Sequence, residues 1–278
     1  MTARRTRTAR KTKRATRAEQ AEKYALYEAA VQEPADEVRL IQRVFKRHHG
    51  RPARLLREDF CGTAALSCAW VRSHHENLAW GIDIDPEPLE WSRSHNVSAL
   101  GPRRADRLTL VEGDVLDARH RRVDVTAAYN FSYLVFRERP QLLRYFRKVH
   151  SGLARAGLFM MDLYGGPDAQ AALSERSEIE GFDYVWEQAR FDPVHQRALN
   201  YIHFEFPDGS SLERAFTYDW RLWGLPELRD LLHEAGFRRT EVLWEGCDPG
   251  SEEGNGVYRP VESADDDPAW IVYLVAVK

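Results

Sequence analysis

Cysteine is scarce in this sequence: only Cys61, Cys68 and Cys247 occur among 278 residues. The number is odd, no CxxC pair is present, and the ten histidines form no HxxxH or HExxH motif. These absences argue against a disulfide framework and against a zinc site. We therefore expect no metal ligands and a reducing, cytoplasmic environment.

Long hydrophobic runs are also missing. The longest ones, such as Trp270–Val277, fall far short of the ~18 apolar residues that a membrane-spanning helix needs. No apolar segment follows the basic N-terminus, so we expect no secretory signal and no membrane partner. With 43% hydrophobic and 11% aromatic residues, the composition is typical of a globular protein with a substantial core.

Acidic residues are absent from positions 1–17, where eight basic side chains occur. The whole chain has a net charge of −3, so the remaining residues carry −11 once that +8 is subtracted. We interpret residues 1–18 as a disordered basic tail. Such a tail could attach to nucleic acid through phosphate contacts, whereas the acidic remainder argues against a nucleic-acid groove elsewhere.

Short apolar strands alternate with amphipathic helices through most of the chain. Helical spacing predicts a helix over 19–31 and a second one that Gly50 and Pro52 close. Strands are predicted at 53–60, 78–84, 107–114, 123–131, 157–164, 240–246 and 270–277. The last two have no helix between them, only a loop at 247–268, and predict an antiparallel hairpin at the sheet edge. The pattern predicts an α/β fold: a Rossmann-like, seven-stranded, mostly parallel sheet with an antiparallel final strand.

This pattern is interrupted after the fifth strand. Residues 183–191, 198–206 and 211–220 have the composition of strands, with turn signals between them at Asp192–Pro193 and Asp208–Gly209. They predict a small antiparallel insert at about 166–217, within a domain that spans 53–278.

Glycines and carboxylates follow the first three predicted strands, at the edge where open α/β sheets bind ligands. Gly62 lies in a turn that lets the backbone approach a ligand. Asp83 follows 21 residues later, about where a carboxylate binds ribose. Asp114 after the third strand could accept a hydrogen bond from an adenine amino group. No GxGxxG or GxxxxGK[ST] loop is present, so a cofactor with adenosine but without phosphates fits best.

The ordered motifs LLREDFCGTA, GIDID, EGD, AAYNFSYL and MDLYGG resemble those of class I S-adenosylmethionine-dependent methyltransferases. The match covers about 53–165 and resumes at 216–278, with Phe60 and Ala64 standing where the first motif has glycines. The resemblance implies an enzyme that uses S-adenosyl-L-methionine, with the helices of 19–52 covering its cofactor site. Asp83 would bind the ribose, Asp114 the adenine edge, and Asn130 would lie near the sulfonium. The implied cofactor-binding set is Glu58, Phe60, Cys61, Gly62, Thr63, Asp83, Ile84, Gly113, Asp114, Val115 and Asn130.

The insert is similar to that of small-molecule N-methyltransferases of the glycine and amino-sugar type, where it covers the acceptor pocket. This second resemblance implies a small-molecule acceptor with an N- or O-nucleophile. The candidates for binding the acceptor are Tyr24, Tyr133, Tyr164, Trp220 and Arg221.

Methyl transfer is an in-line displacement that depends on orientation and on aromatic faces that stabilise a cation. Further aromatic candidates are Tyr129 and Phe131. An alcohol or a protonated amine also needs a general base, for which Asp219, Asp162 and His203 are candidates. The catalytic candidates overall are Asp219, Tyr133 and Tyr27.

Other interpretations of these residues stay open. Asp83 and Asp114 could be turn residues that bond their own backbone, and Glu58 could serve the helix that follows. The alternative functions are a nucleic-acid methyltransferase aided by the basic tail and a non-catalytic module that binds S-adenosylmethionine. The sequence identifies neither the acceptor nor the oligomeric state.

Overall fold

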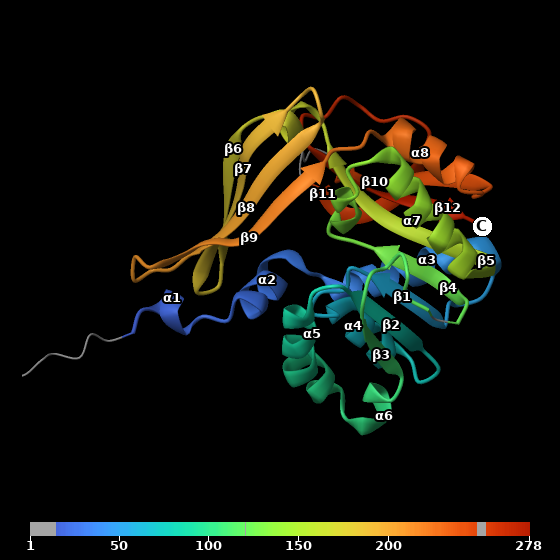
Figure 1. The fold of residues 1–278 in the computed structure, drawn as a ribbon, viewed down its shortest axis with the longest axis horizontal. Helices are drawn as coiled ribbons and strands as arrows, with labels where there is room; N and C mark the ends of the chain where they lie inside the picture. Colours follow the sequence, from blue (N-terminus) through green and yellow to red (C-terminus); the bar gives the residue numbers. More distant parts are fainter. Residues whose placement is uncertain (1–14, 120, 249–253) are drawn as a thin grey trace, which may run out of the picture.

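The structure is a computed structural model that describes residues 15–119, 121–248 and 254–278. An eight-stranded sheet, here called sheet A, carries helices on both faces (Figure 1). A four-stranded antiparallel sheet, called sheet B, projects from one end of it. Within the described residues, no helix is long and apolar enough to cross a membrane.

Sheet A has the strand order β11-β10-β12-β5-β4-β1-β2-β3. Its strands are β1 (Leu55–Asp59), β2 (Leu78–Asp83), β3 (Leu108–Glu112), β4 (Val123–Ala128), β5 (Leu153–Gly165), β10 (Arg239–Cys247), β11 (Gly254–Val261) and β12 (Trp270–Val277). Strands β1 to β5 pair in parallel, and β12 runs antiparallel to both β5 and β10. The predicted Rossmann-like sheet with an antiparallel final strand is confirmed.

Two details of sheet A differ from the prediction. The last two predicted strands, β10 and β12, pair antiparallel as expected, but they do not form the edge, because β12 lies between β5 and β10. The edge is an eighth strand, β11, formed by residues expected to be a loop. Its sequence, GNGVYRPV, contains two glycines and Pro260, and proline is tolerated in a strand only at an edge.

Helices cover both faces of sheet A. They are α3 (Pro34–His49), α4 (Ala65–Ser73), α5 (Pro86–Ser92), α6 (Pro102–Ala105), α7 (Arg139–Gly152) and α8 (Leu225–Glu234), with short helical turns at Arg93–Val97, Ser98–Leu100, Ser132–Val135 and Pro167–Gln170. Helices α3 and α4 share one apolar core, in which Phe45 and Trp70 are fully buried. Helices α7 and α8 belong to a second core that contains Phe146 and Leu232. The two cores lie on opposite sides of the sheet and fix its strand ends in place.

The N-terminal segment forms two helices where one was expected over 19–31. They are α1 (Arg17–Gln20) and α2 (Lys23–Val31). Thr16 and Glu19 form a capping box that starts α1. The backbone N–H groups of Arg17 and Ala18 donate to side chains in the β8–β9 turn of sheet B. Arg17 and Ala18, expected to be part of the disordered tail, therefore belong to α1 and contact sheet B. Residues 1–14 of the expected tail lie outside the described residues.

Sheet B consists of β6 (Leu173–Ile179), β7 (Phe182–Asp192), β8 (Arg197–Glu205) and β9 (Ser211–Arg221), paired in that order. The three strands expected in the insert are confirmed, and the insert sheet extends to Arg221. Strand β6 escaped prediction because its sequence, LSERSEI, is mostly polar and exposed, as an edge strand can be. The cross-strand pairs put Trp186, Asn200 and Tyr218 on one face, which we call the inner face.

Candidate functional site

The turn after β1 keeps the shape of a glycine-rich loop although two of its glycines are replaced. Phe60, Gly62 and Ala64 have φ values of 57°, 50° and 55°, in the left-handed region. That region costs a non-glycine residue roughly 1–2 kcal/mol, so the surrounding fold must impose it. The Phe60 ring packs against the rings of Phe136 and Tyr145, at 5.8 and 5.6 Å. Phe60 is therefore anchored in the core beside α7.

Hydrogen bonds bring the first three strand ends together. Asp83 Oδ2 accepts from the backbone N–H of Gly62 at 2.7 Å, and Oδ1 accepts from that of Asp85 at 2.9 Å. The N–H of Gly113 donates to the carbonyl of Asp83 at 2.8 Å. Beside Asp83, the side chain of Ile84 is 68% exposed. The ends of β1, β2 and β3 thus converge around one carboxylate and one exposed apolar side chain.

Asp114 behaves as a turn residue. Its Oδ1 accepts from the N–H of Leu116 at 2.8 Å. Val115, next to it, is buried, and its carbonyl accepts from Arg57 at 2.8 Å. Asp114 thus bonds the backbone of its own turn, as the turn interpretation expects.

The acidic pair at the end of β1 splits between the two faces of the sheet. Asp59 is paired with Arg57 at 2.5 Å and accepts from the Tyr145 hydroxyl at 2.9 Å, which ties β1 to α7. Glu58 accepts from the N–H of Ser67 in α4 at 2.8 Å. Burial raises the pKa of Glu58 to about 7, and the charges of Asp83 and Asp59 add to the rise. Glu58 therefore accepts a hydrogen bond from the backbone of α4 and also places a carboxyl group beside the Gly62 turn.

Asp162, near the end of β5, holds the loop that follows β4. It is buried and accepts the backbone N–H groups of Asn130 and Phe131 at 2.8 and 2.9 Å. Both of those residues have left-handed backbones, with φ of 56° and 58°. Burial raises the pKa of Asp162 to about 7. Because both of its oxygens accept backbone donors, Asp162 positions Asn130 and Phe131.

A third carboxyl group of this region, Glu37, carries no sequence motif and was not predicted. It lies on α3, and burial raises its pKa to about 8, with the charges of Glu58 and Asp162 adding to the rise. The buried hydroxyl of Tyr129, which has no hydrogen-bond partner, lies in the field of Glu37 and Asp162. Three carboxyl groups therefore gather near the ends of β1 and β5, where a cation would stabilise their ionised forms.

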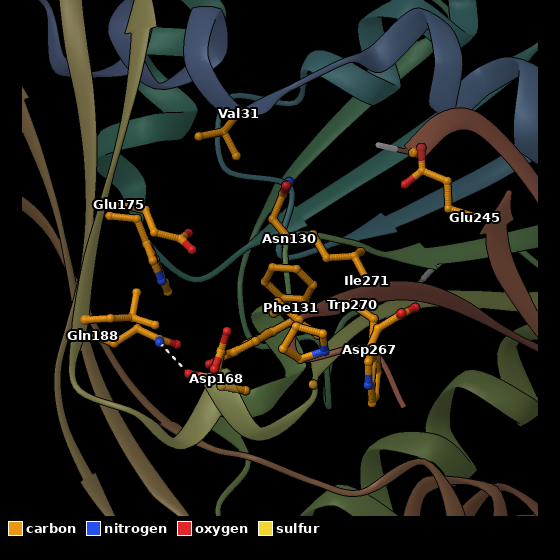
Figure 2. A pocket seen from close by; sticks show the side chains of 18 of the residues that line it. Val31, Asn130, Phe131, Asp168, Glu175, Gln188, Glu245, Asp267, Trp270 and Ile271 are labelled. Carbon is orange, nitrogen blue, oxygen red and sulfur yellow. Dashed lines mark hydrogen bonds between the residues drawn. The ribbon is translucent and has the colours of Figure 1, made fainter. Parts of the chain in front are cut away.

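A cavity of about 990 Å³ lies between the inner face of sheet B and the ends of β5, β10 and β12 (Figure 2). Nine aromatic side chains line it: Tyr27, Phe131, Tyr164, Tyr184, Trp186, Tyr218, Trp220, Trp244 and Trp270. Asn130 and Phe131 also line it, whereas Gly62, Asp83 and Asp114 do not. The loop after β4 therefore joins the cavity to the strand ends.

Three of the predicted acceptor-site or catalytic residues, Tyr27, Tyr164 and Trp220, line this cavity. Trp220 is buried and stacks on Tyr218 with ring centroids 4.4 Å apart. Tyr27, on α2, packs against Phe216 of β9 at 5.0 Å. These side chains come from α2, β5 and β9, so the cavity is assembled by tertiary contacts.

Asp219, Arg221 and His203 do not line the cavity, so the structure does not bring these candidates to its wall. Successive side chains of a strand point to opposite faces, so the neighbours of Trp220 and Ile202 point outward. Asp219 pairs with Arg197 and Arg137. Arg221 stacks on Trp223, with its guanidinium 3.6 Å from the ring centroid. His203 bonds to Glu187 at 2.8 Å.

Tyr133 and Tyr24 also lie outside the cavity lining. Tyr133 is fully buried and its hydroxyl donates to the Asp162 carbonyl at 2.8 Å, which ties the turn after β4 to β5. Tyr24 packs between Trp91 and Phe216, each at 5.9 Å, and so joins α5 to sheet B through α2. Burial raises the pKa of the Cys61 thiol well above its usual range, which argues against a nucleophilic role.

Metal-capable groups gather at one place in the described residues, His74, His75 and Glu76. They precede β2, at the opposite end of the strand from Asp83. The His74 Nε2 atom lies 3.4 Å from an Arg54 nitrogen, and its Nδ1 accepts from the N–H of Glu76 at 3.1 Å. Both ring nitrogens are engaged, so we assign no metal to this cluster.

Solved structures match this chain across most of its length, although no protein-family model and no curated protein matches it in sequence. DesVI of Streptomyces venezuelae aligns with a TM-score of 0.66 at 17% identity, covering 91% of this chain and 96% of that one. The amino pentose methyltransferase CalS10 of Micromonospora echinaspora aligns at 0.64 and 13%, covering 91% and 95%. The sugar N-methyltransferase KedS8 of a Streptoalloteichus species aligns at 0.62 and 16%, covering 99% of both chains.

The chain has the fold of the S-adenosylmethionine-dependent methyltransferases. The alignment with KedS8 covers 99% of this chain, so it includes sheet B and the N-terminal helices as well as sheet A. In this methyltransferase fold the Gly62 turn, Asp83 and Asp114 occupy the strand ends at which open α/β sheets bind ligands.

Proposed function

We propose that this protein is an S-adenosylmethionine-dependent methyltransferase that acts on a small-molecule acceptor. The observation that carries the proposal is the adjacency of two sites. The ends of β1, β2 and β3 converge at Asp83 and Gly62. A large aromatic cavity lies next to them and shares the loop of Asn130 and Phe131.

The residues present fit the cofactor in shape and in charge. S-adenosylmethionine has an adenosine, no phosphate, and positive charges on its sulfonium and ammonium groups. Asp83 is suited to its ribose hydroxyls, and the exposed Ile84 to the face of its adenine. Glu37, Glu58 and Asp162 are carboxyl groups with raised pKa values, and the positive groups of the cofactor would favour their ionised forms. When bound, the cofactor supplies a methyl group on a positively charged sulfur.

The residues of the chain itself would orient the acceptor and exclude water. Asp162 fixes Asn130 and Phe131 at the junction of the two sites. Tyr27, Tyr164 and Trp220 offer ring faces that hold an acceptor, and such positioning in a dry pocket accounts for much of the rate of a displacement. We assign to α2 the role of a cover, because it bridges α5 and β9.

Calorimetry with S-adenosylmethionine and its demethylated product tests the cofactor assignment. We expect both to bind the full-length chain. Asp83→Ala should lower affinity by about 1–3 kcal/mol, or roughly 5- to 150-fold, because ribose hydroxyls lose their partner. Asp85→Ala is the matched control: it removes the N-cap of α5 and should leave affinity unchanged. If neither compound binds, the proposal is wrong.

Release of the demethylated product in the presence of amine, carboxylate and hydroxyl compounds tests turnover. Methyl transfer to any of them supports an enzyme. Tight cofactor binding without transfer to any acceptor class would favour the non-catalytic module instead.

A further inference from the structure

The wall of the cavity carries negative charge that basic residues do not neutralise. Asp168, Glu175, Glu245 and Asp267 line it, and none of its described lining residues is lysine, arginine or histidine. Arg176, next to Glu175 on β6, pairs with Asp183 and Glu205 and so is engaged away from the cavity. The partners of Glu245 are neutral donors, a backbone N–H at 2.6 Å and a tyrosine hydroxyl at 3.2 Å.

The four carboxylates lie on different sides of the cavity (Figure 2). Glu175 comes from sheet B, whereas Glu245 and Asp267 come from the opposite side, with Asn130 and Phe131 between them. A molecule that spans the cavity therefore meets negative charge at both ends. Such a field attracts cations and repels phosphates and carboxylates.

Aromatic rings line both walls as well. On sheet B, Tyr218 and Trp220 stack at 4.4 Å, and Trp186 lies 6.1 Å from Trp220. On the sheet A side, Trp244 and Trp270 pair at 5.4 Å. Ring faces bind flat molecules and also attract cations. The volume of about 990 Å³ lies at the upper end of the roughly 300–1,000 Å³ of small-molecule sites, which leaves room for several rings.

A buried polar pair lies beneath these rings. Asn200 is 0% exposed and occupies the same face of β8 as the cavity-lining Ile202. Its side-chain amide lies beside the Tyr164 hydroxyl, yet neither group makes a hydrogen bond of good geometry. Asn200 is not among the lining residues, so its amide supports the wall from behind and does not itself face a ligand.

We propose that the acceptor is a cationic, multi-ring molecule whose positive groups are held by the cavity carboxylates, and that phosphate-bearing acceptors are excluded. The proposal rests on the proposed function and narrows its substrate class. The cationic, multi-ring acceptor is inferred from three features together: the negative charge of the cavity wall, its aromatic rings and the volume of the cavity. Each feature alone would fit several kinds of ligand.

Three acridines of similar ring size test the charge preference. Quinacrine carries two positive groups, 9-aminoacridine one, and acridine-9-carboxylate a negative one. In fluorescence titrations of the full-length chain, we expect the affinity to fall in that order, with quinacrine at least tenfold tighter than the carboxylate and weakened by salt. Uridine diphosphate at millimolar concentration should not displace quinacrine. Equal binding of the cationic and anionic acridines, or displacement by the diphosphate, would overturn the proposal.

Matched variants locate the effect. Glu175→Gln and Asp267→Asn should each weaken quinacrine about two- to fivefold, the range for exposed charge pairs. Glu178→Gln, on the opposite face of β6, and Asp265→Asn, in the loop before β12 but outside the lining, should not. An equal effect of the control variants would refute the placement. Binding of the demethylated cofactor is measured in the same samples and separates the two proposals. If the cofactor does not bind, the proposed function is wrong, whereas the charge preference of the cavity is still decided by the acridine titrations.

Discussion

At the scale of single residues, the site is dominated by carboxyl groups taken out of water near one another. Burial raises the pKa of Glu58 and Asp162 to about 7 and that of Glu37 to about 8. A carboxyl group whose pKa is raised on folding binds more protons in the folded state than in the unfolded one. Its contribution to stability is therefore present at low pH and is lost as pH rises toward the folded pKa.

The cofactor-free protein should accordingly lose stability as pH rises from about 5 to 8. A cation at the site favours the ionised carboxylates, so the affinity for S-adenosylmethionine should rise between pH 6 and pH 7.5. Urea unfolding across this range measures the first effect, and calorimetry at each pH measures the second. An affinity that does not change with pH would show that these groups do not face the cofactor.

Glu37 is the member of this group that the sequence did not reveal, and its removal isolates the charge effect. Glu37→Gln should weaken S-adenosylmethionine more than its demethylated product, because only the former has a sulfonium charge. It should also flatten the pH dependence at the upper end of this range, since Glu37 itself has a pKa of about 8. Asp36→Asn, at an exposed position paired with Arg39, is the control. Equal losses for both cofactor forms would rule out a contact with the positive sulfur.

At the scale of elements, predictions succeeded where one local pattern decides the structure. Strands β1 to β5 are short segments that alternate with helices except between β3 and β4, and this alternation was enough to predict the parallel part of the sheet. Strand β6 and strand β11 have weak patterns of their own and form because they pair with β7 and β10. Asp219 lies off the inner face because side chains alternate along β9, and Tyr218 and Trp220 at a spacing of two already indicate that face in the sequence.

Helix α2 has few buried residues and should open more readily than its neighbours. Of its nine residues only Tyr24 is buried, and its ion pair between Lys23 and Glu87 is half-exposed. Hydrogen exchange should therefore be faster in α2 than in α3, and should slow in α2 when the demethylated cofactor binds.

Substitutions in α2 sharpen this test. Tyr24→Ala removes the contacts with Trp91 and Phe216 and should speed both the exchange and the release of the cofactor. Lys23→Gln breaks the solvent-screened ion pair with Glu87 and should change the exchange rate of α2 and the release rate of the cofactor by little. If cofactor binding leaves the exchange of α2 unaltered, this helix is not the cover of the site.

At the scale of the whole molecule, the cavity depends on chain segments far apart in sequence. Its wall takes Tyr27 from α2, Asn130 from the loop after β4, Trp186 from sheet B and Trp270 from β12. No local pattern reveals contacts between such distant segments, which explains why the carboxylates of the cavity and its tryptophans on sheet A were not predicted. The insert was expected to cover an acceptor pocket, and the candidates included Tyr27, Phe131, Tyr164 and Trp220. The alignment of three strand ends was predictable because parallel strands place their carboxyl ends at one edge.

Sheet B and sheet A should unfold together, because they share an apolar core. Trp220 and Trp223 belong to the same buried cluster as Phe146 and Phe159. Trp220→Ala should lower the free energy of unfolding by about 3–5 kcal/mol, the usual cost of removing a buried large aromatic ring. Asp219→Ala, on the outward face of the same strand, should cost less than about 1 kcal/mol.

The measurement is urea unfolding followed both by tryptophan fluorescence and by far-ultraviolet circular dichroism. Tryptophans occur in both sheets, so the two curves should coincide for the native chain and shift together in Trp220→Ala. Two separate transitions, or a shift confined to one probe, would mean that sheet B folds as an independent unit. In that case the cavity could widen without loss of the cofactor site, and the acceptor site would no longer have the rigid walls that positioning of a small molecule requires.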